Sequence, residues 1–271
     1  MASYLETAEH IARQAGALLK EFAQRRISFE LKGEFDLVTE ADRASEKFIV
    51  EQLRAYYPSH RILAEEGSAY STSSEYHWYV DPLDGTTNFA HGFPMFNVTL
   101  AVERNEELIA GVIYDPLRDE MFTAEAGAGA CLNGRRIQVS NAHNLTEALV
   151  ATGFPNRKRH LNVNVHFFYQ MAMATHGVRR AGAAALDLAY VACGRLDAFW
   201  EFGLNPWDMA AGILLVREAG GTVTDMRGGT VKLRGPHILA DNTRLHPEIL
   251  QLFSEIFAGG YRFPLPVLGS Q

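Results

Sequence analysis

Three strand-like runs lie close together at residues 95–103, 107–114 and 119–125, and turn-rich stretches join them. Connections this short favour antiparallel pairing of neighbouring strands. The dipeptide Asn133-Gly134 follows, and it is typical of a two-residue hairpin turn. We therefore expect an antiparallel meander in a sheet of about four to six strands.

Helices and further strands precede this meander. Residues 3–24 place apolar side chains on one helical face, and the stretch from Thr39 to about Tyr56 has the same spacing. Short strands are predicted at 28–32, 61–64 and 78–81, with a polar loop between the last two. The N-terminal part is thus predicted to mix both kinds of element.

The pattern changes beyond residue 141. Strands are predicted at 148–153, 196–201, 222–225 and 237–240, and helices at 161–176, 183–193, 206–219 and from about 244. The chain is therefore expected to have an α/β (α+β) fold. We place two halves, packed against each other, at residues 1–143 and 144–271.

Composition excludes several classes of protein. With 271 residues and 47% hydrophobic content, the chain can bury a sizeable core. A net charge of −7 argues against a broad surface for nucleic acid or anionic lipid. Cys131 and Cys193 are far apart, which favours reduced, buried thiols. We find no signal peptide and no apolar run of about 18 residues, so we expect a soluble, cytoplasmic protein with no membrane contact.

Acidic residues stand where predicted elements begin or end, namely Asp42, Glu65, Glu66, Asp81, Asp84 and Asp208. Acids at the ends of neighbouring strands can converge at one edge of a sheet. Mg²⁺ prefers carboxylate and carbonyl oxygens, so Asp81 and Asp84 could share metals, with the Leu83 carbonyl between them as a further ligand. Without a cation such a cluster would repel itself and raise several pKa values.

The residues that follow Asp84 are typical of an anion-binding segment. Gly85-Thr86-Thr87 would begin a turn or helix whose free N–H groups bind phosphate. Carboxylates for Mg²⁺ beside an anion-binding backbone describe a phosphate ester site, where metals make a water nucleophilic.

Structural roles stay open for each acid taken alone. Asp42 with Thr39 also fits a helix capping box, and Asp208 would suit a helix N-terminus for its dipole alone. Glu65-Glu66 could be a solvated pair, and Asp81-Pro82 an ordinary strand exit. Taken together with Gly85-Thr86-Thr87, the acids favour a functional site.

Two motifs, DPLDGTTNF at 81–89 and WDMAAG at 207–212 followed by EAGG at 218–221, resemble the inositol monophosphatase family. The stretch 36–42 and the pair Glu65-Glu66 also match, and the resemblance covers roughly residues 5 to 260. It implies a layered α-β-α-β-α sandwich, usually a homodimer, that hydrolyses phosphate monoesters with Mg²⁺ and is often inhibited by lithium. The nucleotide 3′-phosphatase branch tends to carry a lysine in place of Thr87, so the motif is similar to the inositol branch.

The resemblance also implies roles by position. The first metal would be held by Glu65, Asp81, the Leu83 carbonyl and Thr86, and the second by Asp81, Asp84 and Asp208. Glu65 would reach a third metal through water, which makes two to three Mg²⁺ ions. Thr86, paired with Asp42, would position and activate the attacking water, so the implied catalytic residues are Glu65, Thr86 and Asp42.

Substrate contacts follow in the same way. The Gly85 and Thr86 amides would hold the phosphate, and the inositol hydroxyls would meet Asp84, Gly182, Ala184, Glu201 and Asp208. Lys32 resembles the family's loop lysine near the third metal. Glu201 at a strand end could read polyol hydroxyls, or it could be a surface acid beside Trp200. The basic run 157–160 could form a solvated charged face, or a rim that attracts an anionic substrate or a second phosphate. Arg179-Arg180 could lie at a dimer contact or at the rim.

The sequence therefore predicts Mg²⁺-dependent hydrolysis of a small polyol phosphate, with myo-inositol 1-phosphate as the first choice. The same chemistry on fructose 1,6-bisphosphate, histidinol phosphate or a nucleotide is one rival. A non-catalytic protein that docks on transcription or RNA machinery is a rival of another class, for which direct nucleic-acid contact is not expected.

Overall fold

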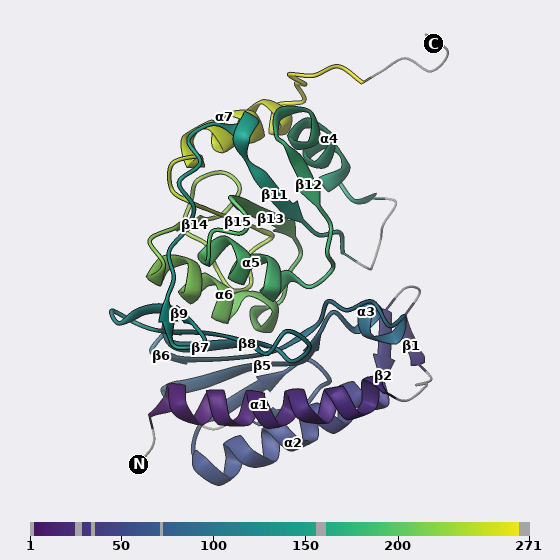
Figure 1. Ribbon diagram of the computed structural model, residues 1–271, viewed down its shortest axis with the longest axis vertical. Coiled ribbons are helices and arrows are strands. Elements are labelled where there is room, and N and C mark those ends of the chain that lie inside the picture. Colours follow the sequence, from purple (N-terminus) through teal and green to yellow (C-terminus); the bar gives the residue numbers. More distant parts are fainter. Residues whose placement is uncertain (1–2, 25–28, 34–35, 71–72, 156–160, 266–271) are drawn as a thin grey trace.

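Five layers of secondary structure stack on one another in the computed structural model (Figure 1). The structure describes residues 3–24, 29–33, 36–70, 73–155 and 161–265. From one side to the other, a helix pair, a sheet, a second helix pair, a second sheet and a third helix pair follow in order (Figure 1). This arrangement confirms the predicted α-β-α-β-α sandwich.

The first layer is formed by α1 (Tyr4–Ala23) and α2 (Glu40–Tyr56), close to their predicted bounds. A capping box between Ser3 and Glu6 begins α1. The apolar face of α1, including Ile11 and Leu19, is fully buried in a core shared with α2 and the first sheet. The 3.6-residue spacing in the sequence therefore marks the face that covers the sheet.

The first sheet has eight strands in the order β10-β9-β8-β7-β6-β5-β3-β4. The strands are β3 (Arg61–Ala64), β4 (Ala69–Tyr70), β5 (Tyr76–Asp84), β6 (Asn97–Arg104), β7 (Glu107–Asp115), β8 (Glu120–Glu125), β9 (Gly129–Leu132) and β10 (Arg135–Arg136). Strands β5 to β10 pair antiparallel in sequence order, which confirms the meander. The expected size of four to six strands is wrong, because β3 joins parallel to β5 and β4 adds an edge.

The polar segment before β5 is only partly a loop. Two of its residues form β4, which pairs antiparallel with β3. A strand of two residues is too short to show an alternating pattern, so it could not be predicted from the sequence. Strand β5 also starts earlier than predicted, at Tyr76.

The middle layer consists of α5 (Ala184–Ala192) and α6 (Pro206–Glu218), which lie between the two sheets (Figure 1). These helices contact each other closely at Gly212, where an added Cβ would lie 2.5 Å from the Cβ of Leu188. Glycine at this position therefore allows the two helices to pack against each other. The core around them includes residues of both sheets, such as Phe122 and Phe199.

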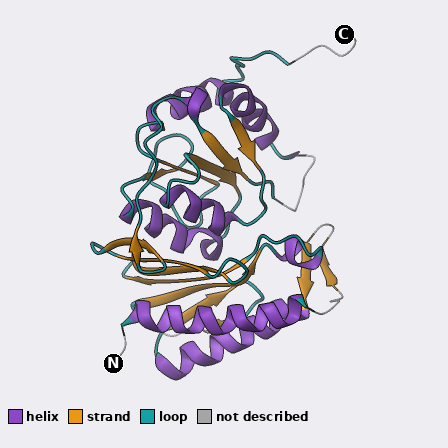
Figure 2. Cartoon of the chain, in the orientation of Figure 1, coloured by secondary structure: helices purple, strands orange, loops and turns teal. Residues whose placement is uncertain are grey.

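The second sheet has five strands in the order β12-β11-β13-β15-β14. They are β11 (Leu149–Thr152), β12 (Gly177–Arg179), β13 (Ala198–Phe202), β14 (Thr222–Thr224) and β15 (His237–Asp241). Helices α4 (Asn164–Ala174) and α7 (His246–Phe257) cover its outer face (Figure 2). The predicted strands and helices of this half are confirmed, except that β12 was missed and α4 is shorter than expected.

Three short elements complete the described chain: the hairpin β1 (Phe29–Gly33) and β2 (Asp36–Thr39), the single-turn α3 (Thr86–Ala90) and a 3-10 turn at Leu145–Glu147. The chain passes from the first sheet to the second between Arg136 and Leu149. Because one core includes residues of both sheets, the division into 1–143 and 144–271 stays a prediction.

Both cysteines are free, and each is half-buried rather than fully buried as expected. Among the described helices, none has both the length and the apolar character that a membrane crossing requires.

Candidate active site

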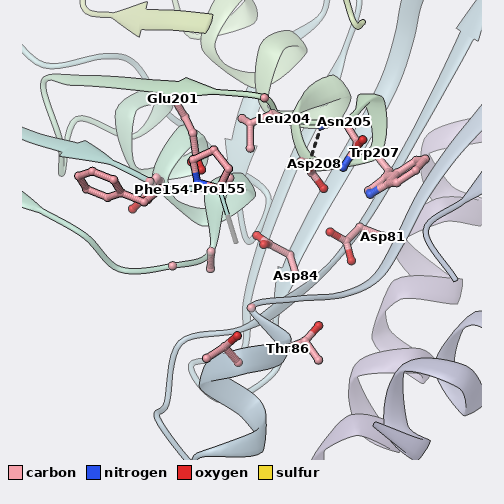
Figure 3. A pocket seen from close by; sticks show the side chains of 18 of the residues that line it. Asp81, Asp84, Thr86, Phe154, Pro155, Glu201, Leu204, Asn205, Trp207 and Asp208 are labelled. Atoms are coloured by element: carbon pink, nitrogen blue, oxygen red, sulfur yellow. Dashed lines mark hydrogen bonds between the residues drawn. The ribbon is translucent and has the colours of Figure 1, made fainter. Parts of the chain in front are cut away.

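A pocket of about 930 Å³ opens between the end of β5, α3, and the segments that lead into α5 and α6. Its lining includes the predicted acids Glu65, Asp81, Asp84, Glu201 and Asp208. Figure 3 shows Asp81, Asp84 and Asp208 around one space, with Thr86 at the bottom of the view and Glu201 at the top. The structure thus brings together acids that lie up to half the chain apart in sequence.

Asp81 and Asp84 both lie in the last part of β5, whereas the predicted strand ended at residue 81. The pairing of β5 with β6 shifts between these two residues. Pro82 between them has no N–H to donate to the sheet, so an irregularity is favoured at this point. The shift places both carboxyl groups on the pocket, while the Leu83 side chain is fully buried.

Asp84 connects the first sheet to the middle helices. Its Oδ2 accepts hydrogen bonds from Asn97 Nδ2 at 2.8 Å and from the Ala185 N–H at 2.9 Å. The carboxyl group therefore lies at the N-terminus of α5, where backbone N–H groups favour a negative charge. Burial raises the pKa of Asp84 to about 6, and these hydrogen bonds act against that rise.

Asp42 has the two roles that the sequence left open. Its Oδ2 accepts from the Thr39 N–H at 2.7 Å and from Thr39 Oγ1 at 2.6 Å, which completes a capping box at the start of α2. Its Oδ1 accepts from Thr86 Oγ1 at 2.9 Å. One fully buried carboxylate thus caps a helix and also holds a hydroxyl that lines the pocket.

Asp208 likewise combines a helix cap with a place in the pocket. One of its oxygens accepts from the Asn205 N–H at 2.7 Å, in a capping box that begins α6 (Figure 3). Burial and the charge of Asp84 raise the pKa of Asp208 to about 7, against the Asn205 hydrogen bonds. The structural role proposed for Asp208 is therefore real, and it does not exclude a ligand role.

Electrostatic repulsion from other acids acts on Asp81. Burial, followed by the nearby Glu65, Asp84 and Asp208, raises the pKa of this carboxyl group well above its usual range. A bound cation would relieve this cost, and the oxygen-only donor set is the one that Mg²⁺ prefers. In the described part of the chain, no three acidic, histidine or cysteine side chains already form a compact metal site. The carboxylates would therefore rotate to hold an ion.

Several predicted substrate contacts also line the pocket, namely Gly85, Thr86, Gly182 and Ala184. Gly85 has a φ of 92°, and an added Cβ would lie 2.8 Å from the Met95 carbonyl oxygen, so the turn into α3 requires glycine. Arg180 lines the pocket too, in agreement with a rim position. Lys32 lies in β1, and its side chain is outside the described part of the structure, as is the whole basic run 157–160.

The sequence analysis assigned no role to Asn88 or to Asp187. Asn88 Nδ2 donates to the Met95 carbonyl at 2.8 Å and to the Ala181 carbonyl at 2.9 Å, which holds α3 beside the segment before α5. Asp187 is buried in α5 and lines the pocket. A single charged residue within the apolar helix sequence AALDLAYVA could have identified it.

Replacing Glu201 with glutamine is expected to stabilise the metal-free protein more as the pH rises. Burial, with Asp187 and Asp208 nearby, raises the pKa of Glu201 well above 4.5. The folded protein therefore keeps a proton that the unfolded chain releases, and this contribution to stability is lost as the pH rises through the folded pKa. Urea unfolding with a chelator, at pH 4.5 and at about pH 8, should show the larger advantage of Glu201→Gln at the higher pH. An equal advantage at both would contradict the account.

Comparisons with known proteins agree with the fold and identify a family. The family model described as "Inositol monophosphatase family" matches residues 1–258. A protein of Pseudomonas aeruginosa named Nus factor SuhB is 49% identical over 258 residues, 92% of this chain and 95% of that protein. An inositol-1-monophosphatase of Mesorhizobium japonicum is 45% identical over 245 residues, 89% of this chain and 92% of that protein.

A solved structure of a related protein has the same fold. The extragenic suppressor protein SuhB of Bartonella henselae superimposes with a TM-score of 0.90 at 42% identity, and the match covers 94% of this chain and 99% of that one. The layered fold with an acidic pocket defines a phosphatase class of protein. Within that class, this chain belongs to the inositol monophosphatase family.

Proposed function

We propose that this protein is a Mg²⁺-dependent phosphatase that hydrolyses a small polyol phosphate monoester, with myo-inositol 1-phosphate as the first choice. One observation carries the proposal: acids from β5, β13 and α6, with Glu65 after β3, line a single pocket at the start of α3. The inositol-1-monophosphatase name of the Mesorhizobium japonicum relative supports the choice of substrate. Two to three Mg²⁺ ions, a cytoplasmic location, a homodimer and inhibition by lithium are parts of the same proposal.

The oxygen donors divide into two sets. Glu65, Asp81, the Leu83 carbonyl and Thr86 would hold the first ion, and Asp81, Asp84 and Asp208 the second. Glu65 would also reach a third ion through water. When bound, the metals supply charge neutralisation for the phosphate oxygens and a lower pKa for the attacking water.

Asp42 and Thr86 would position the attacking water and accept a hydrogen bond from it. The Thr86 hydroxyl donates to Asp42 Oδ1, which turns the lone pairs of Thr86 Oγ1 away from Asp42. These lone pairs can accept a hydrogen bond from a water in the pocket and so hold it in line with the phosphorus. The Gly85 and Thr86 amides would hold the phosphate itself.

The alcohol part of the substrate would meet the opposite wall. Asp84, Asp208 and Glu201 offer oxygen atoms to hydroxyl groups, and Gly182 and Ala184 leave room for the ring. Glu201 lies near the end of β13, in agreement with the strand-end position from which it was predicted to bind polyol hydroxyls. Its side chain is buried, so the alternative of a surface acid is wrong.

The variant Gly153→Ala is expected to raise KM for a polyol phosphate by about tenfold, which corresponds to one lost hydrogen bond. An alanine Cβ at this position would lie 2.0 Å from Glu201 Oε2, so the carboxyl group would have to turn away. Steady-state kinetics on myo-inositol 1-phosphate and on phenyl phosphate, which has no alcohol hydroxyls, will check this. An equal change on both esters would contradict a role of Glu201 in reading hydroxyls.

A substrate panel tests the proposed reaction. Phosphate release with Mg²⁺ is compared on myo-inositol 1-phosphate, fructose 1,6-bisphosphate, histidinol phosphate and a 3′-phosphonucleotide. The proposal predicts the highest kcat/KM on inositol phosphate. Preference for another ester would keep the metal chemistry and change the substrate, and no release on any ester would overturn the proposal.

A second candidate is docking on transcription or RNA machinery. It is included because the Pseudomonas aeruginosa relative is named Nus factor SuhB and not as a phosphatase. Docking alone does not explain why buried carboxylates converge in one pocket at a cost in electrostatic repulsion. The Asp81→Asn variant separates the two functions, since docking would survive the substitution.

A further inference from the structure

Asp187 has no part in the chemistry proposed so far, although it lines the same pocket. It lies on the first turn of α5 and is 2% exposed. Within the described part of the chain its carboxyl group makes no hydrogen bond. The charged groups that interact with it are Asp84, Arg180 and Glu201. A buried carboxyl group without a hydrogen-bond partner is costly, so this one points to a partner supplied by a ligand.

Two other side chains in the pocket lining, Glu201 and Asn162, also have a polar group without a hydrogen-bond partner. The carboxyl group of Glu201 lies over the backbone of Gly153 and has no hydrogen bond to the described residues. Asn162 Nδ2 is buried and has no acceptor there. The pocket lining therefore presents two interacting carboxyl groups, Asp187 and Glu201, and the amide of Asn162, none of which is satisfied by the described protein.

We propose that Asp187 is a specificity-determining residue that hydrogen-bonds a hydroxyl group of the substrate's alcohol. Together with Glu201 and Asn162 it would recognise a polyhydroxylated leaving group. The assignment rests on the proposed phosphatase function and adds to it a residue that selects the substrate.

Hydroxyl groups fit this wall better than an ammonium group. A hydroxyl both donates and accepts, which matches a pocket lining that offers carboxyl oxygens and an amide N–H. Arg180 already places a positive charge near both acids.

A second phosphate fits less well than either. Beside Asp187 and Glu201 it would face two carboxyl groups, each of which disfavours an anion. The wall therefore favours a polyol monophosphate over a bisphosphate.

The test compares Asp187→Leu, which removes the polar group, with Asp187→Asn, which keeps an oxygen and adds an N–H. For Asp187→Leu we expect kcat/KM on myo-inositol 1-phosphate to fall about tenfold or more, with phenyl phosphate unchanged within about twofold. Asp187→Asn should retain most activity on both esters. A melting curve confirms folding, and Asp187→Ala replaces the leucine variant if that one does not fold.

Three outcomes overturn the assignment. An equal loss on both esters would mean a structural role, and no loss on either would mean no contact. If wild type prefers histidinol phosphate and both variants lose it equally, the wall recognises a cation instead.

If the wild-type protein hydrolyses no ester, the proposed function fails, and the contact of Asp187 is then tested separately. The measurement is calorimetry of myo-inositol 1-phosphate binding in the presence of Mg²⁺. Binding weakened about tenfold in Asp187→Leu would support the contact, and unchanged or absent wild-type binding would refute it.

Discussion

Asp81→Asn is expected to reduce Mg²⁺-dependent phosphate release by roughly a thousandfold or more, about 4 kcal/mol of transition-state stabilisation. Asp81 is 2% exposed and is the carboxylate assigned to both metal ions. Asparagine keeps the size of the side chain but removes its charge, so both ions would bind more weakly. The measurement is the initial rate of phosphate release at several Mg²⁺ concentrations.

Asp115→Asn is the matched control. Asp115 is also a fully buried acid at the end of a strand of the same sheet, but it binds Arg118 and lies outside the pocket lining. Its variant should keep the wild-type rate per folded molecule. If Asp81→Asn retained full Mg²⁺-dependent turnover, the metal assignment would be wrong.

Thr86→Ala is expected to lower kcat by about a hundredfold to a thousandfold, the range for a positioned proton-transfer group. The substitution removes the hydroxyl that donates to Asp42 Oδ1 at 2.9 Å. It also leaves the buried Asp42 without one of its hydrogen bonds, while the cap with Thr39 stays intact. The measurement is kcat at saturating Mg²⁺ and substrate, with Mg²⁺ affinity determined separately.

Thr86→Ser provides the control, because serine keeps the hydroxyl and loses only a methyl group. It should recover most of the rate. If serine and alanine were equally impaired, the effect would come from packing of α3 and not from the hydroxyl group.

The parts of the fold that could be predicted are those governed by local pattern. The Asn133-Gly134 turn is an example, since both residues have positive φ values of 48° and 73°, as a tight hairpin between β9 and β10 requires. Helix α1 was likewise predicted from the spacing of its apolar side chains. The two-residue β4 and three-residue β12 were missed because such short strands carry no periodicity.

The candidate site was predictable in its composition and less so in its contacts. The motif residues Asp81, Asp84 and Asp208 stand out in the sequence, and the pocket brings them together. The hydrogen bond from the Ala185 N–H to Asp84 spans 101 residues of sequence, so only packing of α5 against β5 reveals it. The same packing places Asp187 on the pocket.

The dependence of phosphate release on Mg²⁺ tests most directly whether the acidic cluster is a metal centre. Phosphate release from myo-inositol 1-phosphate by the wild-type protein is measured with millimolar Mg²⁺ and again with excess chelator. We expect turnover with Mg²⁺, its loss with chelator and its recovery when Mg²⁺ is restored. Turnover that persists unchanged in chelator would contradict the assignment of Glu65, Asp81, Asp84 and Asp208 to a metal centre.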